Sequence, residues 1–281
     1  MQKRPFGNTG AELSIIGMGG IVVMGATDSD AGRVVGEAVN RGVNYFDVAP
    51  SYGDAEERLG PALAPYRDRV FLACKTNRRD SAGAAEEIEA SLKKLKTDRF
   101  DLYQLHALTT EEEVEACFAK GGAMEAILKA KEKGLIRYLG FSAHSDAAAI
   151  AAMRAFQFDS ILFPFNMTTW HKGSFGQHTM EEATRKGVAR LALKAMANEP
   201  WQEGQPRHHS KCWYEPITDR TKAAQALRWT LSLGITAALP PGEEDLFRLA
   251  LDIAETFKHM EREEMEAVEK AAQERSPIFR S

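Results

Sequence analysis

Short apolar runs alternate with amphipathic segments along most of the chain. The apolar runs occupy residues 14–18, 43–48, 70–74, 100–105, 138–141, 160–163, 188–193 and 235–239. Most of them are bounded by Gly, Pro, Asn or Asp, as buried parallel strands tend to be. Apolar residues at helical spacing follow at 30–41, 81–95, 124–133, 146–155, 179–186, 219–233 and 244–257, and several of these segments stop at a glycine.

Strand patterns that alternate with helical patterns predict a closed barrel with helices on the outside. The length of 281 residues suits such a barrel, which commonly forms one domain of about 250 residues. We therefore predict an α/β fold, a (β/α)8 TIM barrel that forms a single domain over residues 1–281, with a short N-terminal extension. The strongly charged segment 261–275 predicts an extra, solvated helix at the C-terminal end.

Two segments between the predicted elements are longer than usual connections and lack a regular pattern. They are 109–122, after the fourth strand, and 199–218, after the seventh. Both follow the carboxyl ends of strands, where barrel enzymes place their active sites. We expect both segments to be functional loops.

Composition and charge exclude several classes of protein. The net charge is −4 without a basic stripe, which disfavours a nucleic-acid partner. No stretch of about 18 apolar residues predicts a membrane span. Cys74, Cys117 and Cys212 lie far apart, so we expect neither a metal site nor disulfides. Scattered thiols and a start without a signal-peptide pattern favour the cytoplasm, and the oligomeric state stays open.

Four titratable residues lie at the ends of three consecutive predicted strands. Asp47 ends the second strand and Tyr52 follows it, Lys75 comes after the third, and His106 comes after the fourth. An ammonium beside a tyrosine would lower the pKa of the phenol, and a carboxylate would hold the ammonium in place. A histidine could then donate a hydrogen bond to a substrate carbonyl. The set predicts a proton relay toward an oxygen that gains negative charge during reduction.

Each of these residues also has an ordinary structural explanation. Lys75 alone is more often an ion-pair partner, and His106 alone is more often a core histidine. Asp47 could cap a loop and Tyr52 could be a packed ring. Their coincidence on adjacent strands of one predicted barrel face outweighs these separate explanations.

At these residues the chain resembles the aldo-keto reductases. The resemblance rests on segments 42–53, 70–76, 98–106 and 134–142 and extends from about residue 4 to residue 257. It implies that an aldehyde or ketone is reduced with hydride from NADPH, which the family binds across the barrel mouth. It also implies roles for the four residues: Tyr52 gives the proton, Lys75 lowers the pKa of Tyr52, Asp47 pairs with Lys75, and His106 orients the carbonyl.

The resemblance further implies a set of cofactor contacts. They are Gly20, Asp47, Ser142, Asn166, Lys194, Gly242, Arg248 and Asp252. Lys194 stands in the segment where many members place a tyrosine under the nicotinamide, and it could reach a cofactor phosphate. Glu243 and Glu244 stand where basic or hydroxyl residues usually meet the 2′-phosphate. Like charges repel, so NADH is a second candidate beside NADPH, although acids are also ordinary at a helix N-terminus.

The substrate is the least determined part of the prediction. Candidates for the wall of a small-molecule pocket are Phe165, Trp170, Trp201 and Trp213. A stretch of aromatic residues serves more often in packing than in recognition. An uncharged aldehyde or ketone is the first expectation, and His171, Lys172, His208 and His209 leave an acidic or sugar-like substrate open.

Two other functions compete with carbonyl reduction. An aldolase would use Lys75 as a Schiff base, but it needs a lysine with a lowered pKa, and Asp47 would raise that pKa. A nicotinamide-binding redox sensor or channel-associated subunit would bind the cofactor without catalysis. The complete set of Tyr52, Lys75, Asp47 and His106 argues against a pure binder.

Overall fold

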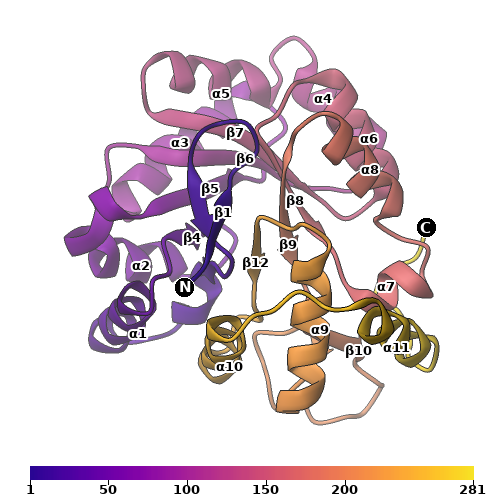
Figure 1. Ribbon diagram of the computed structural model, residues 1–281. Coiled ribbons are helices and arrows are strands. Elements are labelled where there is room, and N and C mark those ends of the chain that lie inside the picture. Colours follow the sequence, from indigo (N-terminus) through magenta and orange to yellow (C-terminus); the bar gives the residue numbers. More distant parts are fainter.

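Eight parallel strands form the centre of the molecule. The computed structural model describes residues 1–281, and its strands lie side by side in the order β12-β9-β8-β7-β6-β5-β4-β3 (Figure 1). They are β3 (Met18–Gly19), β4 (Tyr45–Asp47), β5 (Phe71–Thr76), β6 (Phe100–Leu108), β7 (Ile136–Ala143), β8 (Ser160–Pro164), β9 (Ala189–Leu193) and β12 (Ala237–Leu239). The backbone N–H of Gly17 donates to Ala238 O at 3.0 Å, and Ala238 N–H donates to Ile15 O at 2.9 Å. These bonds join the two ends of the sheet, so the predicted (β/α)8 barrel is confirmed.

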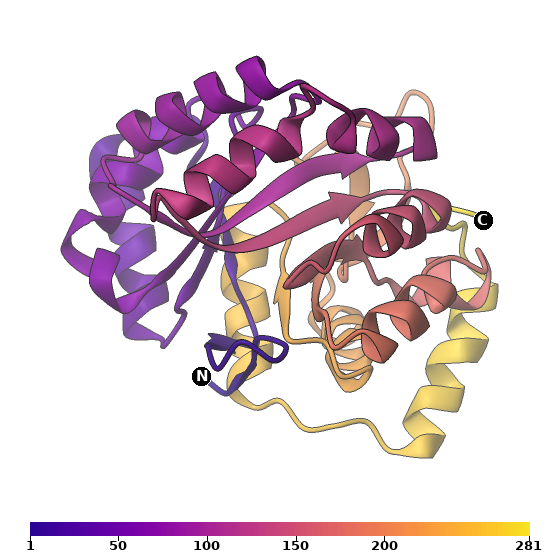
Figure 2. The same ribbon diagram turned by 90° about the horizontal axis from the view of Figure 1, so that it is seen from above.

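Helices cover the outside of the barrel, as Figure 2 shows from above. They are α1 (Asp28–Asn40), α2 (Ala55–Leu63), α3 (Ser81–Lys94), α4 (Glu111–Phe118), α5 (Ala123–Glu132), α6 (Asp146–Ala155), α7 (Met167–His171), α8 (Gln177–Arg185), α9 (Arg220–Ser232), α10 (Glu244–Glu255) and α11 (Arg262–Gln273), with short 3-10 segments η1 (Gly20–Val23) and η2 (Ala64–Arg69). Their apolar faces bury one large core against the sheet. None of the helices is long and apolar enough to cross a membrane.

The predicted N-terminal extension is a hairpin of β1 (Lys3–Pro5) and β2 (Glu12–Ser14). It delivers Phe6 and Leu13 to a second apolar cluster, which is formed with inward-facing strand residues. The ring of Phe6 lies 5.1 Å from that of Phe71 and 5.5 Å from that of Tyr138, edge to face in both cases. The hairpin therefore fills the interior of the barrel from the amino ends of its strands.

The two segments predicted as irregular loops contain regular structure. Residues 109–122 include α4, which begins with a capping box between Thr110 and Glu113. Residues 199–218 belong to a hairpin of β10 (Ala197–Pro200) and β11 (Tyr214–Pro216), and the turn between these strands is long. The Thr-x-x-Glu signature marks the start of α4 in the sequence, whereas nothing local predicts the pairing of β10 with β11.

Two further elements differ from the predicted pattern. The first barrel strand is only Met18–Gly19, because residues 12–14 pair with the N-terminal strand instead. The helix α2 is absent from the predicted set because Gly60 and Pro61 interrupt its helical spacing.

The C-terminal helix is present but is not fully solvated. Val268 and Ala272 of α11 are buried, and the helix packs against α7 and α9. The chain then runs toward the barrel mouth, where Phe279 stacks on Phe175 with ring centroids 5.2 Å apart. Ser281 donates to Ser174 O at 2.7 Å. These contacts bring the last residues close to the candidate site.

Candidate active site

The candidate site is formed by residues that lie on the inward-facing side of the barrel strands, beyond their apolar residues. Alternate residues of a strand face the same side, so Asp47 shares the interior face of Tyr45, and Lys75 shares that of Ala73. His106 lies near the carboxyl end of β6. The predicted catalytic residues therefore lie at the carboxyl ends of the strands, next to the apolar side chains that fill the interior of the barrel.

A buried ion pair between Lys75 and Asp47 forms the base of the site. Lys75 is fully buried and Asp47 is 1% exposed. The ammonium of Lys75 donates to Asp47 Oδ1 and, at 3.1 Å, to Val48 O. Asp47 Oδ2 accepts from Tyr45 Oη at 3.0 Å and from Gln104 Nε2 at 2.9 Å. Because the carboxylate has these additional donors, its burial is compensated and its orientation is set.

Burial by itself lowers the pKa of Lys75, but the attraction of Asp47 and Tyr52 outweighs burial and leaves the pKa above its ordinary value. Lys75 is therefore a permanent cation. Its Nζ lies 5.1 Å from the centroid of the Tyr52 ring. Burial raises the pKa of the Tyr52 phenol, and Lys75 opposes this rise without cancelling it. Lys75 thus acts on the tyrosine pKa in the expected direction, while burial keeps that pKa above its ordinary value and the phenol protonated at neutral pH.

His106 stands beside Tyr52, with ring centroids 5.9 Å apart in an edge-to-face arrangement. Burial and the nearby positive charges of Lys75, Arg79 and Lys194 lower the pKa of His106 to about 2. The imidazole is therefore neutral over the physiological range. A neutral imidazole keeps one N–H that can donate to a carbonyl oxygen.

These groups open into one cavity at the carboxyl ends of the strands. Its volume is about 240 Å³. This is just below the range of about 300–1,000 Å³ that is typical of small-molecule sites. Its lining comprises Gly19, Ile21, Asp47, Tyr52, His106, Ser142, His144, Leu162, Leu193, Lys194, Lys211, Trp213, Tyr214, Leu239, Pro240, Pro241 and Gly242.

Several predicted cofactor positions lie on this lining. Ser142 is 1% exposed, and its Oγ accepts from the Ala107 N–H at 2.7 Å, which leaves the hydroxyl hydrogen free to donate. Gly242 stands where a Cβ would collide with the side chain of Ile21. Gly20 itself is buried against Val48, whereas its neighbours Gly19 and Ile21 line the cavity. The lining of the cavity therefore reaches the barrel seam between η1 and α10.

The long turn of the β10–β11 hairpin crosses this seam. Lys211 Nζ donates to Val22 O at 2.9 Å, and Lys211 N–H donates to Glu243 Oε1 at 2.8 Å. One residue of the turn thereby joins η1 to the start of α10. Lys211 is a lining residue that the sequence patterns do not single out.

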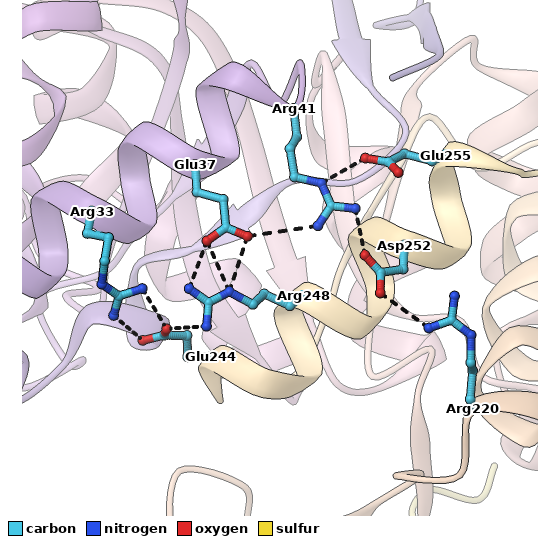
Figure 3. Close-up of polar contacts among 8 residues, drawn as sticks. All are labelled: Arg33, Glu37, Arg41, Arg220, Glu244, Arg248, Asp252 and Glu255. Atoms are coloured by element: carbon cyan, nitrogen blue, oxygen red, sulfur yellow. Dashed lines mark hydrogen bonds and ion pairs between the residues drawn. The ribbon is translucent and has the colours of Figure 1, made fainter.

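Arg248 and Asp252 lie in an ion-pair network between α1 and α10, away from the cavity lining (Figure 3). Arg248 Nη2 contacts Glu37 Oε2 at 2.8 Å, and its Nη1 contacts Glu244 Oε1 at 2.7 Å. Asp252 contacts Arg41 at 2.7 Å. The network joins four arginines to four carboxylates, namely Arg33, Arg41, Arg220 and Arg248 with Glu37, Glu244, Asp252 and Glu255. Its charges balance, so Arg248 carries no unpaired positive charge toward a ligand.

Asn166 has a structural role here. Its Nδ2 donates to Lys194 O at 3.0 Å and to Ala197 O at 2.9 Å. Its Oδ1 accepts from the Thr168 and Thr169 N–H groups at the start of α7. Both ends of the amide are used within the protein, so in this conformation Asn166 has no free group for a cofactor.

Of the predicted substrate residues, only Trp213 lines the cavity, and it is 52% exposed. Phe165 is fully buried in the core. Trp170 packs edge to face on Trp229 at 5.9 Å. Trp201 donates from its indole nitrogen to Cys212 O at 2.9 Å. These three side chains support the walls from behind and do not face the site.

Other functional positions were not singled out by the sequence patterns. Tyr45 and Gln104 could have been found, because each precedes a predicted catalytic residue by two positions on the same strand. Phe279 could not, because it follows a charged helix and reaches the mouth only through tertiary packing. Its ring stacks on that of His144, with centroids 5.5 Å apart.

Comparison with known proteins supports the same assignment. The model of the Aldo/keto reductase family matches residues 15–212. An uncharacterized oxidoreductase of Bacillus subtilis, YqkF, is 33% identical over 156 residues, which are 50% of this chain and 49% of the relative. The aldo-keto reductase YhdN of the same organism is 37% identical over 125 residues, 38% of each chain. The chain therefore spans half or less of the curated relatives that it matches.

A solved structure shows the likeness in three dimensions. The aldo-keto reductase of Bacillus halodurans in its holo form superposes with a TM-score of 0.77 at 22% identity and covers 99% of this chain and 98% of its own. That likeness concerns the fold. Together with the family match over most of the barrel, it establishes that this chain belongs to the aldo/keto reductase family.

Proposed function

We propose that this protein reduces an aldehyde or ketone to an alcohol, with a nicotinamide dinucleotide as the hydride donor and Tyr52 as the proton donor. The observation that carries the proposal is the arrangement of four groups at one cavity. A buried Lys75–Asp47 pair lies beneath Tyr52, and the neutral His106 lies beside Tyr52. Family membership supports the same reaction.

The residues divide the work of proton transfer and charge stabilisation. The Tyr52 phenol holds a proton at neutral pH and can give it to the alkoxide that forms as the carbonyl is reduced. Lys75 then stabilises the phenolate by its charge, and Asp47 keeps Lys75 in place. His106 offers an N–H to the carbonyl oxygen while carrying no charge of its own.

The residues along the cavity fit a dinucleotide that supplies the hydride when bound. Ser142 Oγ can donate to a carboxamide, and Gly19, Ile21 and Gly242 carry the lining of the cavity to the seam between η1 and α10. The ammonium of Lys211 lies at the same seam. Lys75 is a poor Schiff-base residue, because its ammonium is fully buried and charged.

The test is a fluorescence titration of the protein with NADH and NADPH, followed by turnover of each with a set of aromatic aldehydes. We expect saturable binding and consumption of reduced cofactor that depends on the aldehyde. Binding without turnover of any carbonyl compound would favour the sensor function. Absence of binding to both cofactors would overturn the proposal.

At the adenosine end we propose that NADH is preferred over NADPH. The segment after Gly242 carries Glu243 and Glu244, and Arg248 is held by Glu37 and Glu244. A 2′-phosphate would have to separate these pairs and would meet the carboxylates, whereas a 2′-hydroxyl would not. The charge balance of the α1–α10 network thus supports the smaller cofactor.

Glu244→Gln is expected to lower the dissociation constant for NADPH relative to that for NADH by roughly two- to fivefold, because one partly exposed charge is removed. The readout is the ratio of the two constants from fluorescence titration. Glu255→Gln is the matched control, because it belongs to the same network at the far end of α10. An unchanged ratio in Glu244→Gln, or an equal change in the control, would contradict the assignment.

A further inference from the structure

Two lysines, Lys194 and Lys211, line the cavity, and Lys194 differs in its strained backbone and its aromatic neighbours. It follows β9 in a left-handed backbone conformation with φ +65, which is rare for a residue with a side chain. Its carbonyl accepts from Asn166 Nδ2, and the Ala197 N–H donates to the same carbonyl at 3.0 Å. Backbone strain that is held in this way tends to occur at functional sites.

The ammonium of Lys194 lies in an aromatic enclosure without a carboxylate. Its Nζ lies 3.1 Å from His144 Nε2 and 5.5 Å from the ring centroids of both Trp213 and Phe279. The side chain is 9% exposed. Burial lowers the pKa of Lys194 to about 7, and no acidic side chain is close enough to offset the burial. An anion brought next to this group would supply the missing partner.

The acidic groups of the cavity cannot serve as that partner. Asp47 is its only lining carboxylate, and it is already paired with Lys75. Burial and Lys194 lower the pKa of His144 to about 3, so this ring is neutral and accepts from the ammonium. The cavity therefore offers no acidic partner to the protonated form of Lys194.

The position of Lys194 indicates which ligand would bring the anion. Its side chain reaches across the end of β8 to His144, which follows β7, and its charge acts on His106. The other lining lysine, Lys211, contacts Val22 at the seam where we place the dinucleotide. Lys194 is thus directed toward the reacting carbonyl, and Lys211 is directed toward the cofactor.

We propose that Lys194 binds a carboxylate of the substrate, so that this protein reduces carbonyl compounds that carry an acid group. This inference rests on the proposed function and narrows its substrate class. Trp213 and Phe279 contact each other edge to face at 5.7 Å beside the ammonium. Trp213, which lines the cavity, would pack against the organic part of the same molecule, while His106 meets its carbonyl.

The wild-type protein provides the first test. Its kcat/KM is measured for 3- and 4-carboxybenzaldehyde and for the corresponding carboxamides, which match the acids in shape but carry no charge. We expect at least one acid to exceed its amide about tenfold or more, because a hydrogen bond between charged partners strengthens binding by that order. Reduction of all compounds without preference for either acid would overturn this inference and leave carbonyl reduction intact. Failure to reduce any of them would contradict the proposed function itself.

Lys194→Met tests the residue, because it keeps most of the length of the side chain and removes the charge. We expect the acid-to-amide ratio of kcat/KM to fall about tenfold, mainly through KM, with little change for the amides. Lys211→Met is the matched control and should preserve the ratio. Thermal melting of both variants establishes that they are folded.

The anion that Lys194 binds could be a carboxylate of the substrate or a phosphate of the cofactor. Direct binding of the cofactor distinguishes these two sources. Dissociation constants for NADH and NADPH are measured by fluorescence for both variants without any aldehyde present. If Lys194 bound a cofactor phosphate, Lys194→Met would weaken both constants and would affect acids and amides equally. That result, or loss of the ratio in Lys211→Met alone, would overturn the assignment of Lys194.

Discussion

Tyr52→Phe is expected to lower kcat for carbonyl reduction by about 10²- to 10⁴-fold, the range that a positioned general acid contributes. The substitution removes only the phenolic oxygen. The Lys75–Asp47 pair beneath the ring keeps its other partners, which are Val48, Tyr45 and Gln104. The measurement is steady-state turnover with saturating cofactor and aldehyde, together with the cofactor dissociation constant.

The cofactor should bind to Tyr52→Phe almost as well as to the wild type, which separates loss of chemistry from loss of binding. Tyr66→Phe is a suitable control, because Tyr66 packs on the outer core and away from the cavity. It should retain the wild-type rate. A Tyr52→Phe protein with wild-type kcat would show that another group delivers the proton.

Lys75→Met is expected to abolish reduction and also to destabilise the fold by about 3–5 kcal/mol, because it leaves a buried carboxylate without its counter-charge. Asp47 would keep only the neutral donors Tyr45 and Gln104. Urea unfolding measures the stability, and steady-state kinetics measures the activity. Arg262→Met, which breaks an ion pair between side chains that are 91% and 54% exposed, should change stability by less than about 1 kcal/mol.

The double variant Lys75→Met/Asp47→Asn separates the two effects of Lys75. A neutral asparagine no longer needs a counter-charge, so most of the lost stability should return. The activity should not return, because no cation remains beneath Tyr52 to stabilise its phenolate. Recovery of activity with stability would mean that Lys75 has only a structural role.

The barrel and the convergence of its candidate catalytic residues could be predicted because both depend on local pattern. Apolar strand residues alternate with outward-facing positions, and the same alternation aligns Tyr45 with Asp47 and Ala73 with Lys75. The carboxyl ends of parallel strands meet at one mouth, so Asp47, Lys75 and His106 had to converge once the barrel was predicted. The pairing of Lys75 with Asp47 is the direct result.

The pKa of Tyr52 could not be predicted from the sequence in the same way. The sequence indicates that a lysine lies near the tyrosine and predicts a lowered pKa. The structure adds the degree of burial, which favours the neutral phenol more than Lys75 disfavours it. Residue types predict the sign of each contribution, but their relative size depends on how closely the surrounding chain excludes water.

The outer parts of the site were determined by packing between distant segments. Arg248 finds Glu37 across 211 positions of the chain, which removes it from the set of free phosphate ligands. Phe165 and Trp170 were predicted to line the substrate pocket. Instead, Phe165 is buried in the core and Trp170 packs against Trp229. Their direction depends on the path of the chain after β8, which no local pattern encodes.

By itself, the sequence determined the barrel, the order of its strands and the identity of the four central residues, because periodicity and strand ends are local properties of the chain. Only the tertiary structure decided what surrounds Lys194. The enclosure by His144, Trp213 and Phe279 joins a strand end, a hairpin turn and the C-terminal tail. Those segments are far apart in the chain, and their meeting depends on the packing of α11 against α7 and α9. Desolvation of one lysine is thus a collective result of the fold, since no neighbouring residue produces it alone.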